Sequence, residues 1–213
     1  MSDCCSAKGC ELEKLAQQAE QRRVLIAVLA INLVMFVVEF GAGFIAGSAA
    51  LMADSVDMLG DALVYGVSLY ALDRSLRWRA GAALFKGGFI LLLGVGVLIQ
   101  IGTRLTTGVP PASGLMLVFG ALALVANLVC LRLLWRFRSH DVNMASTFEC
   151  SRNDVIANVG VLVAAAGVAA FASPWPDIIV ASAIAIIFLR SAIRILMSGS
   201  REFRAAGTPQ AAE

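Results

Sequence analysis

The stretch AALMADSVDMLGDALVYGVSLYAL, residues 49–72, decides how the rest of the chain is organised. It is long and apolar enough to cross a bilayer, yet it contains Asp54, Asp57 and Asp61. On a helix these positions share one face, because they are spaced i, i+3 and i+7. An ionised carboxylate at mid-membrane costs about 2.5–3.5 kcal/mol on insertion scales, so three on one face indicate a bound cation.

An acidic face of this kind can also arise in two ways that need no cation. The aspartates could pair with an Arg of a neighbouring helix, or the segment could be a soluble amphipathic helix with a solvated acidic side. Residues 49–72 contain no Lys or Arg, and the opposite face is apolar. That pattern favours a cation site inside a membrane.

The composition of the whole chain excludes an ordinary soluble domain. Hydrophobic residues make up 59% of the sequence and charged residues 15%, and the mean hydropathy is +0.82. Apolar runs of membrane-spanning length predict an all-α integral membrane protein with six transmembrane helices. The predicted spans are Val24–Ala46, Ala49–Leu72, Gly87–Gly102, Ser113–Trp135, Asp154–Ala172 and Asp177–Met197.

Basic residues predict the orientation, because Lys and Arg near span ends are retained in the cytoplasm. They lie in the amino-terminal segment, in the links after the second and fourth spans, and after the sixth; Arg104 alone falls on the other side. We therefore expect both termini to be cytoplasmic, in a bacterial inner membrane. The net charge of +2 reflects this topology and does not indicate nucleic-acid binding.

The spans divide the chain into a leader, residues 1–23, a transport domain, residues 24–197, and a disordered cytoplasmic tail, residues 198–213. We expect no soluble carboxyl-terminal domain. The leader contains Cys4, Cys5 and Cys10. In a reducing cytoplasm such thiols either capture metal or are redox-active or incidental.

Polar residues inside the other spans suggest a shared interior. Asn32 and Glu39 are seven residues apart, so they lie on one helical face, where they line a polar cavity or, for Asn32, bond to another helix. Glycines of the third span favour close packing or a subunit contact. Cys130 is expected to be a small hydrophobe. His140 is a surface residue or lies at a metal entrance.

The second and fifth spans together contain a set of metal ligands. Asp57 and Asp61 are spaced i, i+4, as are Cys150 and Asp154. Four such side chains on facing helices can form a tetrahedron, which Zn2+ accepts, whereas a thiol argues against Mg2+ or Ca2+. Asn158 lies four residues after Asp154, on the same face of the fifth span and one turn deeper in the membrane. Asp54 is a candidate for a proton path or for supporting the ligands, with structural hydrogen bonding as the alternative.

Three runs resemble the cation diffusion facilitator family: NLVMFVVEFGAGFIAGSAALMADSVDMLGD from Asn32, NMASTFECSRNDVIANVGVL from Asn143 and PDIIVASAIAIIFLRSAIRIL from Pro176. The resemblance implies a six-helix transporter, commonly dimeric, that exports divalent metal in exchange for protons. Carried over by position, the ligands are Asp57, Asp61, Cys150 and Asp154. The expected cargo is Zn2+, Cd2+ or Co2+, with no prosthetic group and no enzymatic activity.

The sequence departs from the family at two points. Many zinc-transporting members have His at the position of Cys150 and His or Asp at that of Asp57, so the thiol here softens the site towards Cd2+. Members usually end in a cytoplasmic metal-binding domain, without which a homodimer forms through the spans. A membrane metal sensor without transport activity, in which the leader cysteines act, is the main alternative, and a proton-coupled carrier for an organic cation is another.

Overall fold

The described residues form six long helices that alternate in direction, as the all-α prediction requires. The structure is a computed structural model that describes residues 3–71, 76–138 and 142–205, with side chains from residue 19 onward except around the two gaps and at a few other positions. The helices are α1 (Asp3–Ala46), α2 (Ala49–Ala71), α3 (Leu76–Thr107), α4 (Ser113–Trp135), α5 (Val142–Phe171) and α6 (Trp175–Ala205).

Five of these helices are long and apolar enough to cross a membrane: Ala19–Ala46 of α1, Gly87–Thr107 of α3, α4, Phe148–Phe171 of α5 and Trp175–Arg201 of α6. Large apolar side chains such as Val37, Phe44 and Ile99 are more than 60% exposed on the outside of the bundle. An exterior of this kind suits lipid rather than water. The sixth helix, α2, has the same length of 23 residues as α4 but contains the three aspartates.

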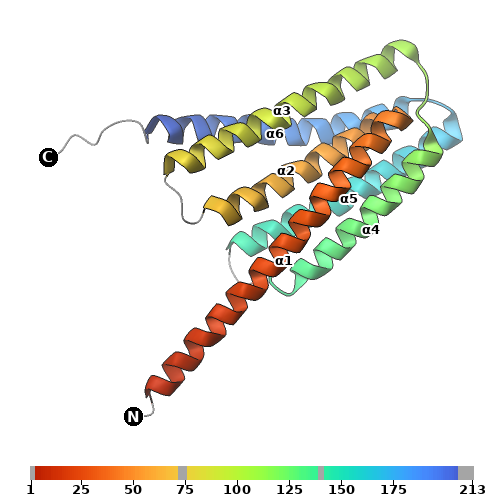
Figure 1. Cartoon of the computed structure of the whole chain (residues 1–213). Helices are drawn as coiled ribbons and strands as arrows, with labels where there is room; N and C mark the ends of the chain where they lie inside the picture. Colours follow the sequence, from red (N-terminus) through yellow and green to blue (C-terminus); the bar gives the residue numbers. More distant parts are fainter. Residues whose placement is uncertain (1–2, 72–75, 139–141, 206–213) are drawn as a thin grey trace.

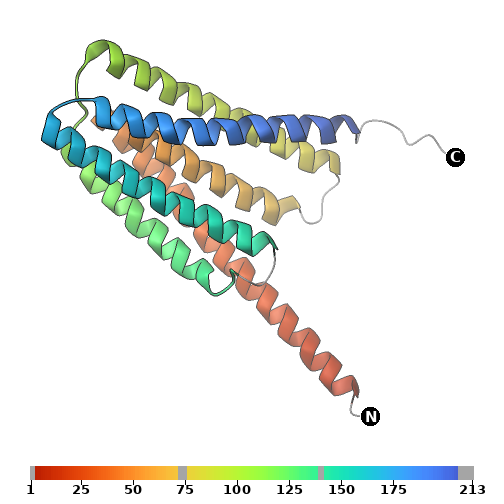
Figure 2. The same ribbon diagram turned by 180° about the vertical axis from the view of Figure 1, so that it is seen from behind.

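The helices form two groups with α2 between them. Helices α3 and α6 run side by side along one flank, and α1, α4 and α5 form the other (Figure 1). Helix α2 contacts all five of the others, so its acidic face is enclosed by the bundle. The start of α1 and the end of α6 lie at one end of the bundle, together with the end of α2, the start of α3, the end of α4 and the start of α5 (Figure 2).

The turn between α1 and α2 is as tight as predicted. Gly47 has a φ of +65°, the left-handed conformation that terminates helices, and Ser48 donates its N–H to the carbonyl of Gly43 at 2.9 Å. A Cβ at Gly47 would also overlap the Arg104 guanidinium. This turn makes α1 and α2 antiparallel neighbours.

The glycines of α3 serve packing within the chain. A Cβ at Gly87 would lie 2.8 Å from Leu196 Cγ, and one at Gly94 would meet Leu189 and Phe188, all on α6. Gly88 and Gly96 have open space instead. One face of the glycine run therefore lets α3 and α6 approach closely.

Several helices extend past the predicted spans. Helix α3 covers 76–107 instead of 87–102, α5 begins at Val142 rather than Asp154, and α1 continues without a break from the leader. Helix α6 reaches Ala205, so residues 198–205 are helical where a disordered tail was expected. The extensions are polar and contain no proline, so nothing ends the helix where the apolar run ends.

Candidate metal site

Carboxyl groups from three helices meet inside the bundle. Glu39 on α1, Asp54 on α2 and Asp154 on α5 are each at most 4% exposed, and Asp57 and Asp61 are half-buried further along α2. Asp154 interacts electrostatically with all three aspartates of α2, and Glu39 with Asp54 and Asp154. The predicted acidic residues therefore act on one another in the region where α1 and α5 both pack on α2.

Arginine pairing does not account for the most deeply buried of these groups. Within the described part of the chain, the charged groups that act on Glu39, Asp54 and Asp154 are themselves carboxyl groups. The ion pairs of Arg136 with Glu20, at 2.6 Å, and of Arg152 with Glu149 are both on the exposed surface. Several like charges buried together are stable only if protons or a cation neutralise them.

Asn158 holds α2 and α5 together beside these acids. Its Nδ2 donates to Asp54 Oδ2 at 2.9 Å and to the carbonyl oxygen of Asp154, one turn earlier on α5, also at 2.9 Å. Asn158 is fully buried. Because the Asn158 amide is hydrogen-bonded to both helices, it fixes the position of Asp54 along the helix axis relative to Asp154.

Several buried polar atoms near the acids have no hydrogen-bond partner among the described residues. They are Oδ1 of Asn158 and Oγ of Ser151, and the carboxyl oxygens of Glu39, which can hydrogen-bond to the Asp54 carboxyl group only if one of the two acids is protonated. A buried polar atom without a partner costs about 1–3 kcal/mol, so such atoms usually meet water or an ion. The interior of the bundle thus offers unsatisfied oxygen atoms beside its carboxyl groups.

Asn32 lies at the contact of α1 with α4, opposite Asn127. One turn before it, Val28 packs in one cluster with Cys130, and one turn after it, Met35 packs with Ala123. Asn127 lies between Cys130 and Ala123 on α4. The side-chain amides of Asn32 and Asn127 are therefore at about the same position along the α1–α4 contact. Both are buried, and Asn32 Oδ1 and both amide atoms of Asn127 are among the unpartnered atoms of the described chain. No hydrogen bond from Asn32 to α4 is found within those residues.

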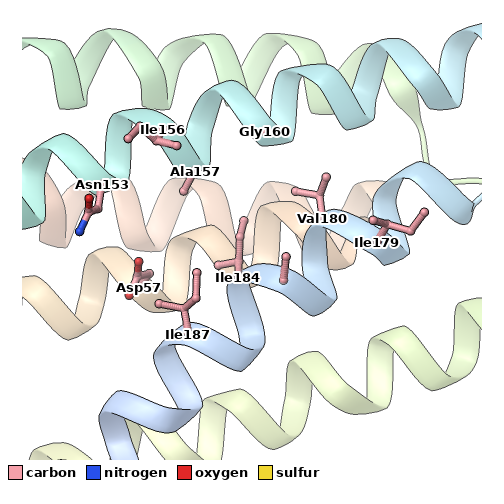
Figure 3. Close-up of a pocket in the computed structure, with 10 residues that line it drawn as sticks. Asp57, Asn153, Ile156, Ala157, Gly160, Ile179, Val180, Ile184 and Ile187 are labelled. Atoms are coloured by element: carbon pink, nitrogen blue, oxygen red, sulfur yellow. The ribbon is translucent and has the colours of Figure 1, made fainter.

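Asp57 borders a groove between α5 and α6. The groove has a volume of about 480 Å3 and is lined mainly by apolar side chains of these two helices: Ile156, Ala157, Gly160, Ile179, Val180, Ala183, Ile184 and Ile187. Figure 3 shows the Asp57 carboxylate beside Asn153 and Ile187. Several lining isoleucines are more than 60% exposed, so the groove opens on the lateral surface of the bundle.

Cys150 is half-buried on α5, one turn before Asp154, as the i, i+4 spacing predicts. Within the described residues, no three His, Cys, Asp or Glu side chains already converge closely enough to hold a metal ion. Helices α2 and α5, which contain Asp57, Asp61, Cys150 and Asp154, contact each other. As a complete ligand set the four residues stay a prediction.

Two other predictions concern side chains outside the described residues. Cys4, Cys5 and Cys10 lie on the first turns of α1 by their backbone, but their side chains are not described. His140 falls between α4 and α5, in a stretch that is not described. Metal capture by the leader and a role for His140 at an entrance therefore stay predictions.

Among the described residues, five buried polar ones were not singled out for a role from the sequence: Ser48, Ser55, Asn127, Ser151 and Asp177. Asn127 could have been recognised from the sequence, because it is an amide in the middle of the apolar run of α4. Ser151 sits beside Cys150 but carries no signal of its own. Asp177 begins a span, where an acidic residue is common, and only the fold reveals its partner.

Comparison of the sequence with known proteins identifies the family of this chain. Residues 25–203 match the cation efflux transmembrane domain. The chain is 26% identical over 208 residues to a "Cadmium, cobalt and zinc/H(+)-K(+) antiporter" of Bacillus subtilis, with 86% of this chain and 66% of the relative covered. It is 26% identical over 210 residues to "Zinc transporter ZitB" of Yersinia pestis, covering 92% of this chain and 66% of the relative.

A third relative is the "Metal cation efflux system protein CzcD" of Cupriavidus metallidurans, 27% identical over 198 residues, with 83% of this chain and 62% of the relative covered. The chain thus spans slightly less than two thirds of the length of these relatives. The match to the transmembrane domain covers all six helices. The chain therefore belongs to the cation efflux transmembrane domain family, the cation diffusion facilitators that its sequence resembles.

Proposed function

We propose that this protein exports a divalent transition-metal ion, Zn2+, Cd2+ or Co2+, across a membrane in exchange for protons. The observation that carries the proposal is the meeting of Glu39, Asp54 and Asp154 in an apolar bundle, where the groups acting on them are other carboxyl groups. A divalent cation is the simplest neutralising partner for such a cluster. Membership of the family and the printed names of the relatives support the same class of cargo.

We assign the ion to Asp57, Asp61, Cys150 and Asp154. The first two are on α2 and the others on α5, and these helices are tied by the Asn158–Asp54 hydrogen bond. These two helices contact each other, so side chains from both can reach one ion. A mixed carboxylate and thiolate set suits a borderline or soft ion, which keeps Cd2+ in competition with Zn2+.

Proton coupling follows from the chemistry of these ligands. Carboxylates and a thiolate bind metal only when deprotonated, so a metal ion and protons compete for the same side chains. Metal loading from one side therefore releases protons, and protons from the other side displace the metal. Rocking of one group of helices against another is the change that exposes the site alternately. We assign Glu39, Asp54, Asn32 and Asn158 to a proton path or to the support of the ligands.

The orientation and assembly also belong to the proposal. Arg136, Arg138, Arg152 and Arg201 lie at the end of the bundle that holds the start of α1 and the end of α6, which is the cytoplasmic end by the positive-inside rule. In a bacterium this places the protein in the inner membrane. The lipid-facing apolar side of the spans is the surface through which a homodimer would form.

Flux in proteoliposomes tests the proposal. Purified protein is reconstituted with a metal-sensitive dye inside and an imposed pH gradient, and Zn2+, Cd2+ or Co2+ is added outside. Asp61→Asn and Asp154→Asn should abolish flux, whereas Glu149→Gln, which removes an exposed carboxylate on α5, should not. Full flux in both site variants would remove those residues from the site, and no flux in the wild type would favour a metal sensor.

One observation favours a second cargo. The groove between α5 and α6 is almost wholly apolar and has the Asp57 carboxylate on its wall, a combination that suits a lipophilic organic cation. Competition separates the two cargoes. Transport of tetraphenylphosphonium that Zn2+ does not inhibit would support the organic-cation alternative. Transport of the metal ions alone would rule that alternative out.

A further inference from the structure

The first turn of α2 is held by a carboxylate of α6. Ser48 Oγ donates to Asp177 Oδ1 at 2.6 Å, the N–H of Ala49 donates to Oδ2 at 2.8 Å, and the N–H of Ala50 donates to Oδ1 at 3.1 Å. Asp177 and Ser48 are both fully buried. The two residues are 129 positions apart in the chain, so this is a contact that the fold creates.

These bonds satisfy groups that a helix cannot satisfy itself. The first N–H groups of a helix have no intrahelical acceptor, and a side chain just before the helix normally takes one of them. Here Ser48 Oγ accepts from the N–H of Leu51 at 3.1 Å, and Asp177 takes the N–H groups of Ala49 and Ala50. A carboxylate at a helix N-terminus is also favoured by the helix dipole.

The charge of Asp177 is balanced on the other side by Arg104. The guanidinium is close enough to attract the carboxylate, and its Nη1 donates to the carbonyl of Val109 at 3.1 Å. Arg104 belongs to α3, the helix that packs along α6. The α3–α6 group therefore carries both the carboxylate and its counter-charge, and α2 is attached to this group through its first turn.

The rest of the α2–α6 contact has little directional character. It joins small or branched apolar side chains, Ala49, Ala53 and Val56 on α2 with Ile178, Ala181 and Ala185 on α6. Such surfaces pack well in more than one register, whereas hydrogen bonds of defined geometry do not. Asp177 thus determines the height and rotation of α2 against α6. Asp57 lies about 12 Å along the helix from Ala49, so a change at the first turn is transmitted to the acidic face.

We propose that Asp177 is a positioning residue: by capping α2 from α6, it sets where Asp57 and Asp61 stand relative to α5 and so determines the affinity of the ion site. This inference rests on the proposed function for the identity of the ion. It assigns Asp177 no contact with the ion itself. A purely structural anchor would affect how much protein folds but not how tightly the folded protein binds metal.

The experiment compares Asp177→Asn with Glu149→Gln, an acid-to-amide change of the same kind at an exposed ion pair. Folded, monodisperse protein is isolated by size exclusion, so that losses in folding are removed before measurement. Hydrogen exchange is followed at residues 49–52 and 54–61, and Zn2+ affinity is measured by titration calorimetry. Ser48→Ala serves as a second variant, because it removes the two hydrogen bonds of Ser48 Oγ and leaves the Asp177 carboxylate in place.

We expect Asp177→Asn to speed exchange at Ala49 and Ala50 by about tenfold and to weaken Zn2+ binding by at least about threefold per folded molecule, with a smaller loss in Ser48→Ala. Wild-type Zn2+ affinity in Asp177→Asn, despite faster exchange at residues 49–52, would overturn the proposal. If the wild type itself binds no Zn2+, the proposed function fails. The positioning role is then judged on exchange alone: faster exchange through residues 54–61 supports it, and a change confined to residues 49–52 overturns it.

Discussion

Asn158 on α5 donates a hydrogen bond of 2.9 Å to Asp54 on α2, and both side chains are buried. This bond joins the two helices that carry the proposed ligands, at the level where the acids of α1, α2 and α5 interact. A neutral amide that contacts a carboxyl group in an apolar interior stabilises the charged and the protonated form alike, because it can donate or accept. The α2–α5 pair is thereby kept together in either state.

Removing this amide should weaken the bundle. Asn158→Ala leaves Asp54 buried without its donor, a change that costs about 1–3 kcal/mol. We expect a lower thermal unfolding temperature in detergent and reduced metal flux. Asn153→Ala is the matched control, since Asn153 is an exposed amide on the same helix. Equal unfolding temperatures for the two variants would show that the Asn158–Asp54 bond does not hold α2 to α5.

The choice of metal should depend on Cys150. Replacement of the thiol by imidazole hardens the ligand set, so Cys150→His should raise the preference for Zn2+ over Cd2+ in the flux assay. Cys130→Ala, a change in a buried cysteine of the apolar α1–α4 cluster, should leave the ranking of metals unchanged. If Cys150→His has the same ranking as the wild type, the thiol is not a ligand.

Metal affinity should fall as the pH is lowered. The ligands bind Zn2+ only after losing their protons, so each proton displaced on binding weakens the apparent affinity by up to about tenfold per pH unit in the acid range. Calorimetry in buffers of different ionisation enthalpy counts the protons released. An affinity that is constant between pH 6 and 8, with no proton release, would argue against exchange of metal for protons.

The α3–α6 contact makes a prediction about stability with a matched pair of glycines. In Gly94→Ala the new Cβ would meet Leu189 and Phe188 of α6, whereas in Gly96→Ala it enters open space. The first variant should lower the unfolding temperature. The second should keep or raise it, because Ala favours a helix over Gly by up to about 1 kcal/mol. The reverse order would contradict the packing of α3 on α6.

Much of this fold can be predicted from sequence, because long apolar runs in a membrane must satisfy their backbone groups as helices. The tight turn at Gly47 and Ser48 and the shared face of the α2 aspartates follow from local rules. The ends of α3 and α5 do not, since their polar extensions remain helical outside the apolar run. Contacts such as Ser48 with Asp177 depend on how distant helices pack, and no local pattern indicates them.

The candidate site is predictable to a similar extent. Spacing places Cys150 and Asp154 on one face of a helix, and Asp57 and Asp61 on another. Which helices face each other follows only from the packed bundle, where Asp154 interacts with the α2 aspartates. The spacing does not determine whether the four side chains converge on one ion, and among the described residues no ready-made group of three ligands is found.

Anomalous X-ray scattering from crystals of the Cd2+-loaded protein tests the central claim most directly. The account predicts one strong peak between α2 and α5, within coordinating distance of Asp57, Asp61, Cys150 and Asp154. A well-folded, Cd2+-loaded protein whose peak lies away from Asp61 and Asp154 would contradict it.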